Sequence, residues 1–183
     1  MRDKEEILSE NENLKAQIDS LTEQNNKLIQ DQTEYVRLQQ MYNLDQQYTE
    51  YPKIAAEIIS KDPGNWYDTF MINRGSADGI RVDNNVLADK GLVGIVTEVG
   101  THWATVRSII DDSSNVSAMT VSTQDNCVVE GDLELIDEGK LSFSQLYDQN
   151  NKVTVGERIV TSNISEKYVE GLFIGYVSEV EQN

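Results

Sequence analysis

Apolar side chains recur at alternating steps of three and four residues through the first fifty positions of the chain. This spacing is the heptad pattern of a coiled coil. Ile7 and Leu14 begin the row of d positions, and Asn11 and Ile18 begin the row of a positions. Because no Gly or Pro interrupts this stretch, we expect one helix over residues 1–50.

The heptad positions predict that the helix associates with further copies of itself, as a homodimer or a higher assembly. Leucine at d with asparagine at a favours a parallel, in-register dimer, because each buried amide can bond only to its counterpart. The predicted dimer contacts are Ile7, Asn11, Leu14, Ile18, Leu21, Asn25, Leu28 and Tyr35. The alternative is a lone helix packed on its own domain. About 40 residues at about 1.5 Å each give a helix of about 60 Å, which is too long for a small domain to cover.

After Pro52 the hydrophobic period changes from that of a helix to that of strands. Short segments rich in Val, Ile and Thr alternate with Gly, Asp and Asn turn signals. The predicted strands are 54–61, 69–73, 86–89, 92–99, 104–110, 116–122, 127–131, 141–145, 158–162 and 172–180. This pattern predicts a mainly β region that forms small barrels or a sandwich.

An internal repeat divides the β region into two units. GLVGIVTEV at 91–99 returns as GLFIGYVSEV at 171–180, and VDNNVLA at 82–88 returns as VGERIVT at 155–161. Two matched hairpins in the same order indicate two related β units, each close to the smallest size that folds alone. We therefore expect packed barrels at 51–105 and 106–183, with strands from 156–183 completing the first barrel as an alternative.

Composition narrows the classes of partner. The chain carries 32 acidic and 15 basic residues, a formal charge of −17. Phosphate would repel such a surface, so nucleic acid and anionic headgroups are not expected partners. No apolar run approaches the roughly 20 residues of a membrane span, and no signal peptide is visible. Cys127, the one cysteine, is expected to be buried and inert in a strand.

Candidate chemistry is sparse, so we expect no catalytic residue, cofactor or metal site. The alternative for a double barrel is a chymotrypsin-like serine hydrolase. Its catalytic triad would have to consist of His102, Asp111 or Asp112, and a serine such as Ser162. No phosphate-binding loop or dinucleotide fingerprint is present. Aromatic residues in polar, loop-like settings are the candidate partner anchors, because interfaces favour exposed aromatic side chains. These candidates are Trp66, Tyr147 and Tyr168.

Several motifs, taken in order, resemble one family. They are WYDTFMINRGSADGI at 66–80, GLVGIV at 91–96, IIDD at 109–112, VGERIVTS at 155–162 and GLFIG at 171–175, all after a coiled coil. This arrangement is similar to MreC, the family of bacterial rod-shape-determining proteins. The resemblance covers nearly the whole chain.

The resemblance implies a coiled coil followed by two six-stranded barrels outside the cytoplasmic membrane. It implies a scaffold of the cell-wall elongation machinery that contacts penicillin-binding proteins, MreD and, through segments before residue 1, MreB. The chain is then expected to be an ectodomain whose transmembrane anchor precedes residue 1. One departure concerns residues 163–169, NISEKYV, where the family has a glycine-rich stretch and Phe-Pro. A periplasmic adaptor of an export pump is a further alternative, but such adaptors fold their helices back as a hairpin.

Overall fold

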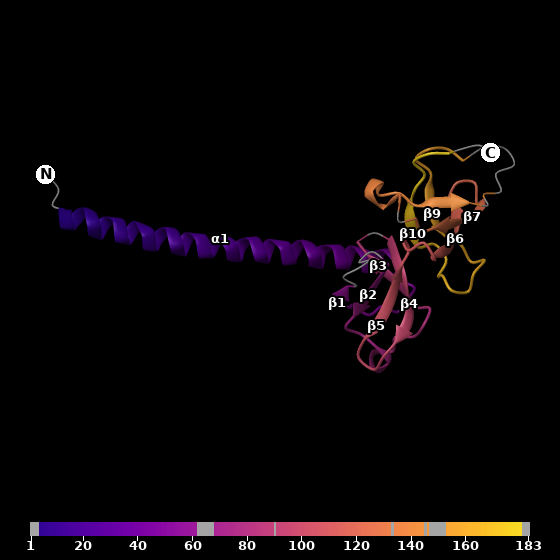
Figure 1. Ribbon diagram of the computed structural model, residues 1–183, viewed down its shortest axis with the longest axis horizontal. Coiled ribbons are helices and arrows are strands. Elements are labelled where there is room, and N and C mark those ends of the chain that lie inside the picture. The colour runs from indigo at the N-terminus through magenta and orange to yellow at the C-terminus, as the bar shows by residue number, and fades with distance from the viewer. Residues whose placement is uncertain are drawn as a thin grey trace. The chain divides into compact units, whose positions relative to one another are not determined.

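The computed structural model describes residues 4–61, 68–89, 91–132, 134–144, 146 and 153–180. The chain divides into two compact units, Met1–Tyr51 and Pro52–Asn183, and each is described by itself. Figure 1 labels the elements of both units.

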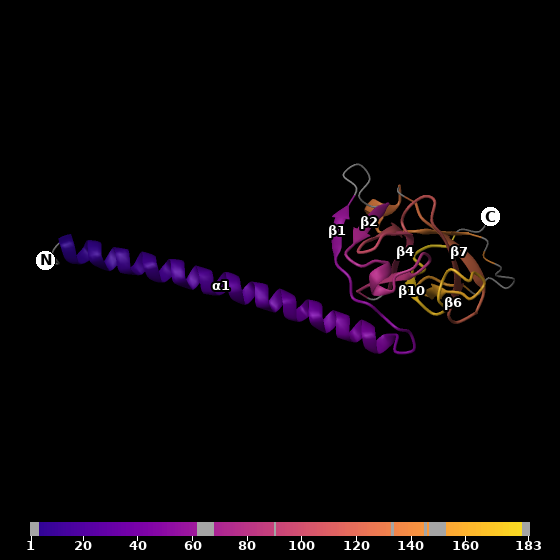
Figure 2. The same cartoon turned by 90° about the horizontal axis from the view of Figure 1, so that it is seen from below.

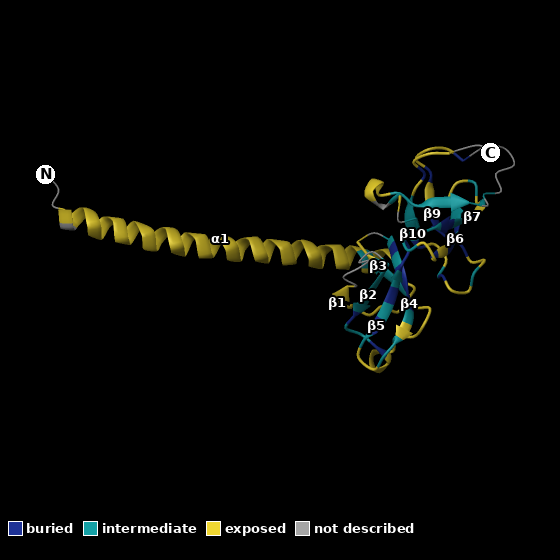
Figure 3. Ribbon diagram, in the orientation of Figure 1, coloured by how far each residue is buried: buried dark blue, intermediate teal, exposed yellow. Residues whose placement is uncertain are grey.

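The first unit is one helix, α1 (Lys4–Gln47), of 44 residues. At about 1.5 Å per residue it is about 66 Å long. It ends before Pro52 because the proline ring clashes with the carbonyl four residues earlier, that of Tyr48. In Figure 3 the exposed colour runs along almost all of the described helix. The predicted helix is therefore confirmed, and its apolar side chains lie on the surface of the single chain.

The second unit contains two antiparallel sheets (Figure 2). The first has the order β1-β2-β5-β4-β3 and the second has the order β10-β9-β6-β7-β8. The first sheet comprises β1 (Ile58–Lys61), β2 (Thr69–Ile72), β3 (Asn85–Ala88), β4 (Gly91–Val99) and β5 (Ala104–Ser108). The second comprises β6 (Asn115–Thr120), β7 (Asn126–Glu130), β8 (Ser142–Ser144), β9 (Arg158–Thr161) and β10 (Phe173–Tyr176). Two short 3-10 helices lie at Ser76–Asp78 and Ile136–Glu138.

Each of the ten predicted strand segments overlaps an observed strand, so the mainly β prediction is confirmed. Two six-stranded barrels are not confirmed, since each described sheet has five strands and its two outer strands pair on one side only. The first sheet ends at Ser108, close to the expected boundary at 105. The C-terminal strands β9 and β10 pair within the second sheet, through β6, and not within the first.

Backbone geometry supports the internal repeat. The N–H of Asp83 donates to the carbonyl of Val96 at 2.9 Å. At the matching positions, the N–H of Gly156 donates to the carbonyl of Val177 at 2.7 Å. The return bonds from residues 96 and 177 are also alike, at 2.9 and 2.8 Å. Asp83 and Gly156 both adopt a positive φ, 67° and 91°, so the two halves of the β unit make the same left-handed turn before the hairpin strand.

The core follows the period of two expected for strands with one buried face. In the first sheet Val96 and Val106 are almost completely buried, and in the second Val116 is fully buried. Cys127 on β7 is also buried, and loss of hydration raises the pKa of its thiol to about 11. Since the thiolate is the reactive form, the prediction of an inert cysteine agrees with this environment.

Candidate partner-binding surfaces

The predicted dimer contacts all lie on α1, and those that are described are exposed. Their large apolar members range from 50% exposed at Ile7 to 67% at Leu28. Asn11 and Asn25 are exposed among them. Positions three and four apart share one side of a helix, so the eight residues form a continuous stripe, which we call the seam. Such a stripe of exposed Leu and Ile is unfavourable in water unless it is covered.

Of the three predicted aromatic anchors, the structure describes one, Tyr168. Trp66 and Tyr147 lie outside the described residues. Tyr168 is buried, with only 8% of its surface exposed, so its ring packs inside the β unit instead of presenting itself to a partner. Burial raises the pKa of the Tyr168 phenol, against the opposing effects of a hydrogen bond from Ser114 and the charge of Arg107.

An exposed aromatic group does occur on β10, an outer strand of the second sheet. Tyr176 is 66% exposed. In the strand register it lies opposite Arg158 of β9, which is also exposed. Val121, whose N–H donates to the Arg158 carbonyl at 3.0 Å, is also exposed. The Phe173 and Tyr176 ring centroids lie 5.2 Å apart. These four residues form the second surface, which we call the β10 patch.

The β10 patch combines apolar area with a fixed cation. The Arg158 guanidinium carbon lies 4.9 Å from the centroid of the Phe173 ring, within the range of a cation–π contact. Tyrosine, arginine and phenylalanine are the residue types enriched in the buried centres of protein interfaces. The arrangement can therefore bind an apolar or aromatic protein segment that also carries an acceptor for arginine.

Sequence reasoning missed this patch because Tyr176 occurs in an apolar strand, where an aromatic side chain usually belongs to the core. The available signal was positional. Tyr176 lies in the C-terminal copy of the repeated hairpin. The last strand of a chain can form the outer strand of its sheet, and this would have predicted an exposed side chain at Tyr176. Outer strands have one neighbour, and their side chains are covered less completely.

The side chains proposed for a serine hydrolase do not form a usable site. Ser162 is completely buried, and its Oγ has no hydrogen-bond partner among the residues that the structure describes. The Asp111 carboxylate accepts a hydrogen bond from the Ser113 N–H at 2.8 Å, which is a turn contact. His102 is exposed in the turn after β4. A nucleophile must reach its substrate, so the buried Ser162 cannot serve as one.

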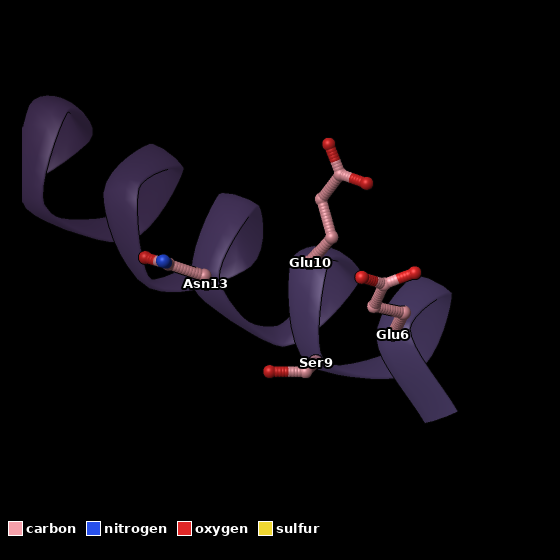
Figure 4. Close-up of a pocket in the computed structure, with 4 residues that line it drawn as sticks. All are labelled: Glu6, Ser9, Glu10 and Asn13. Carbon is pink, nitrogen blue, oxygen red and sulfur yellow. The ribbon is translucent and has the colours of Figure 1, made fainter. Parts of the chain in front are cut away.

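A shallow depression on α1 is no better as a ligand site. Figure 4 shows its lining residues, Glu6, Ser9, Glu10 and Asn13, along the outside of one helix. Ligand sites are concave and enclose most of their ligand, which one helical surface cannot do. Within the described ranges, no group of three or more His, Cys, Asp or Glu side chains could hold a metal ion. The same part of the chain contains no helix long and apolar enough to cross a membrane.

The long helix with an exposed heptad seam and the two packed antiparallel sheets define a mainly β protein with an N-terminal helix. The chain belongs to the MreC family, because the family model described as "Rod shape-determining protein MreC, barrel core" matches residues 58–183. Members of this family are named as cell shape-determining proteins.

Individual relatives agree with this membership. The cell shape-determining protein MreC of Listeria monocytogenes is 28% identical over 179 residues, which cover 94% of this chain and 59% of that protein. A solved MreC structure from the same genus and species matches with a TM-score of 0.65 and 28% identity, covering 95% of this chain and 83% of that one. The chain thus spans less than two thirds of the length of the Listeria relative.

A third match concerns a complex. The solved structure of a complex between penicillin-binding protein PBP2 and MreC from Helicobacter pylori contains a chain that matches with a TM-score of 0.56. The identity is 13%, and the match covers 69% of this chain and 77% of that chain. At this identity the likeness shows a shared fold.

Proposed function

We propose that this chain is a non-enzymatic scaffold of the cell-wall elongation machinery, located outside the cytoplasmic membrane. It dimerises through the seam of α1 and binds a penicillin-binding protein through the β10 patch. Family membership supports the role in cell shape. The observation that carries the binding proposal is the exposed Tyr176 beside Arg158, in a fold shared with an MreC solved in complex with PBP2.

The dimer proposal depends on the composition of the seam and its flanks. A parallel dimer would bury Leu14 and Leu21 at d positions and would place Asn11 opposite its counterpart. It would also place Glu10 at g near Lys15 at e of the other copy, a pair of opposite charges. Paired helices would present two β units together, which raises the effective concentration for partners that bind both.

The remaining proposed partners are MreD and, through segments before residue 1, MreB. A membrane anchor there would place the β unit outside the cytoplasmic membrane and would bring MreD and MreB within reach. These parts of the proposal rest on the family resemblance.

Binding measurements on single variants test the β10 patch. We expect Tyr176→Ser and Val121→Ser to weaken binding of the purified chain to the ectodomain of its elongation penicillin-binding protein about tenfold, as loss of an interface anchor typically does. Biolayer interferometry would measure the dissociation constants. Val82→Ser is the matched control, because Val82 is 53% exposed and belongs to the first half of the β unit.

Equal weakening by all three substitutions, or unchanged binding by Tyr176→Ser, would contradict the assignment of the patch. A wild-type chain that fails to bind any penicillin-binding protein would contradict the proposed function itself.

A further inference from the structure

The connection between β9 and β10 is much longer than its counterpart in the first sheet. Residues 162–172 join these two strands, whereas two residues, 89–90, join β3 to β4. The repeat therefore contains an insertion at this point. Its central part, residues 163–170, includes the segment 163–169 that departs from the family pattern, and we call it the 163–170 loop.

The first sheet holds this loop through a side-chain amide. Asn85 on β3 donates from Nδ2 to the carbonyl of Lys167 at 2.8 Å. Its Oδ1 accepts the N–H of Val169, also at 2.8 Å. In a parallel sheet, one residue of a strand bonds to a carbonyl and an N–H that lie two residues apart on the neighbouring strand. Asn85 thus takes the place of a strand partner for the loop, across more than 80 residues of sequence.

The second sheet holds the same loop from the other side. The hydroxyl of Thr161, at the end of β9, donates to the carbonyl of Val169 and accepts the N–H of Leu172 at 2.8 Å. Thr161 is completely buried. The N–H of Gly171 donates to the Thr161 carbonyl at 3.0 Å. Val169 is therefore bonded to both sheets, since its N–H contacts the first and its carbonyl contacts the second.

Packing at the junction agrees with these bonds. Tyr168, between the two residues held by Asn85, is buried. Groups from both sheets influence its phenol, namely Arg107 of β5 and Ser114 before β6. Nearby, a side chain added at Gly91 would place its Cβ 2.4 Å from the carbonyl oxygen of Phe173, so β4 and β10 approach without room for one.

We propose that Asn85 and the 163–170 loop form a latch that fixes the second sheet against the first. Because the loop leads directly into β10, the latch also positions the β10 patch. Asn85 is a positioning residue in this account, and its effect on partner binding rests on the proposed function. The latch itself does not depend on the identity of any partner.

Hydrogen exchange in the full chain tests the first step. In Asn85→Ala the Val169 N–H loses its acceptor, so we expect it to exchange about tenfold faster or more, as loss of one hydrogen bond implies. Amides in β5 and β7 should keep their protection. The matched control is Asn115→Ala, which removes an exposed asparagine side chain from β6. Unchanged exchange at Val169 in Asn85→Ala would overturn the latch.

Distances between the sheets test the second step. Spin labels on Glu98→Cys in β4 and Asn126→Cys in β7 would report the separation of two exposed positions. The native Cys127 is buried and has a raised pKa, so it should not take up the label. Electron paramagnetic resonance should give a narrow distance distribution with Asn85 present and a broader one in Asn85→Ala. Faster exchange with an unchanged distribution would mean local loop opening only and would overturn the latch.

Two further measurements test the latch if the first variant does not fold, and separate the latch from partner binding. If Asn85→Ala does not fold, Asn85→Asp is measured, because it keeps an acceptor for Val169 and loses the donor to Lys167. The latch predicts a broadened distribution for this variant, and an unchanged distribution would overturn the latch. Weaker partner binding by Asn85→Ala with Tyr176 intact would support the positioning role. If the wild type binds no partner while the latch variants still broaden the distribution, the proposed function fails and the latch stands.

Discussion

Replacing Leu14 and Leu21 together by lysine should convert the chain from a dimer to a monomer. Both side chains are more than half exposed in the single chain, and both lie at d positions of the seam. Burying a leucine contributes about 1.5–3 kcal/mol, so two per helix should raise the dimer dissociation constant about a hundredfold or more. Sedimentation equilibrium should give twice the chain mass of 20.7 kDa for wild type and the chain mass for the variant.

The control for this prediction places the same charges elsewhere on the helix. Ala16→Lys with Gln30→Lys adds two lysines at f positions, which face away from the seam. This control should remain dimeric. Circular dichroism should show lost helicity only in the seam variant, because a lone helix of this composition is marginal in water. A monomeric wild type at micromolar concentrations would contradict the dimer.

The second large effect is expected at Gly94, in the middle of β4. A Cβ there would lie 2.3 Å from the carbonyl oxygen of Arg107 and 2.7 Å from Cγ1 of Val106. The carbonyl belongs to the neighbouring strand, so it can move only by disturbing the β4–β5 ladder. Gly94→Ala should therefore lower the free energy of unfolding of the β unit by about 3 kcal/mol or more, measured by urea denaturation.

The internal repeat supplies the matched control. Gly175 is the glycine of the second copy, yet among the described residues no atom beyond its two chain neighbours lies within 4 Å of the position its Cβ would take. Gly175→Ala should change the free energy of unfolding by no more than about 0.5 kcal/mol. Equal losses at Gly94 and Gly175 would contradict the packing described for the first sheet.

Local pattern predicted much of the fold. The helix and the strands follow from periods of 3.6 and two residues, and from turn residues such as the Asp83 turn and its match at Gly156. The order of strands within each sheet could not be predicted, because it depends on long-range pairing. The contact of Asn85 with residues 167 and 169 could not be predicted either. A hydrogen bond from a side-chain amide to a distant backbone produces no periodic pattern in the sequence.

Two tyrosines show why the candidate surface was harder to predict than the fold. Tyr168 lies in a polar segment and was a candidate partner anchor, but its loop folds over the junction of the two sheets and buries it. Tyr176 lies among apolar residues, a setting typical of the core, but its strand is at the edge of a sheet and its side chain is exposed. Local polarity indicates average exposure, whereas the position of a strand within its sheet decides the exposure of each side chain.

The most direct test of the central claim is photo-crosslinking in cells that make the native, full-length protein. A benzoylphenylalanine in place of Tyr176 should form an adduct that stains with fluorescent penicillin, because the proposed partner of the β10 patch is a penicillin-binding protein. The same substitution at Val82 should give no stained adduct. An adduct at position 176 that never stains with penicillin would contradict the claim that this chain binds penicillin-binding proteins through its second sheet.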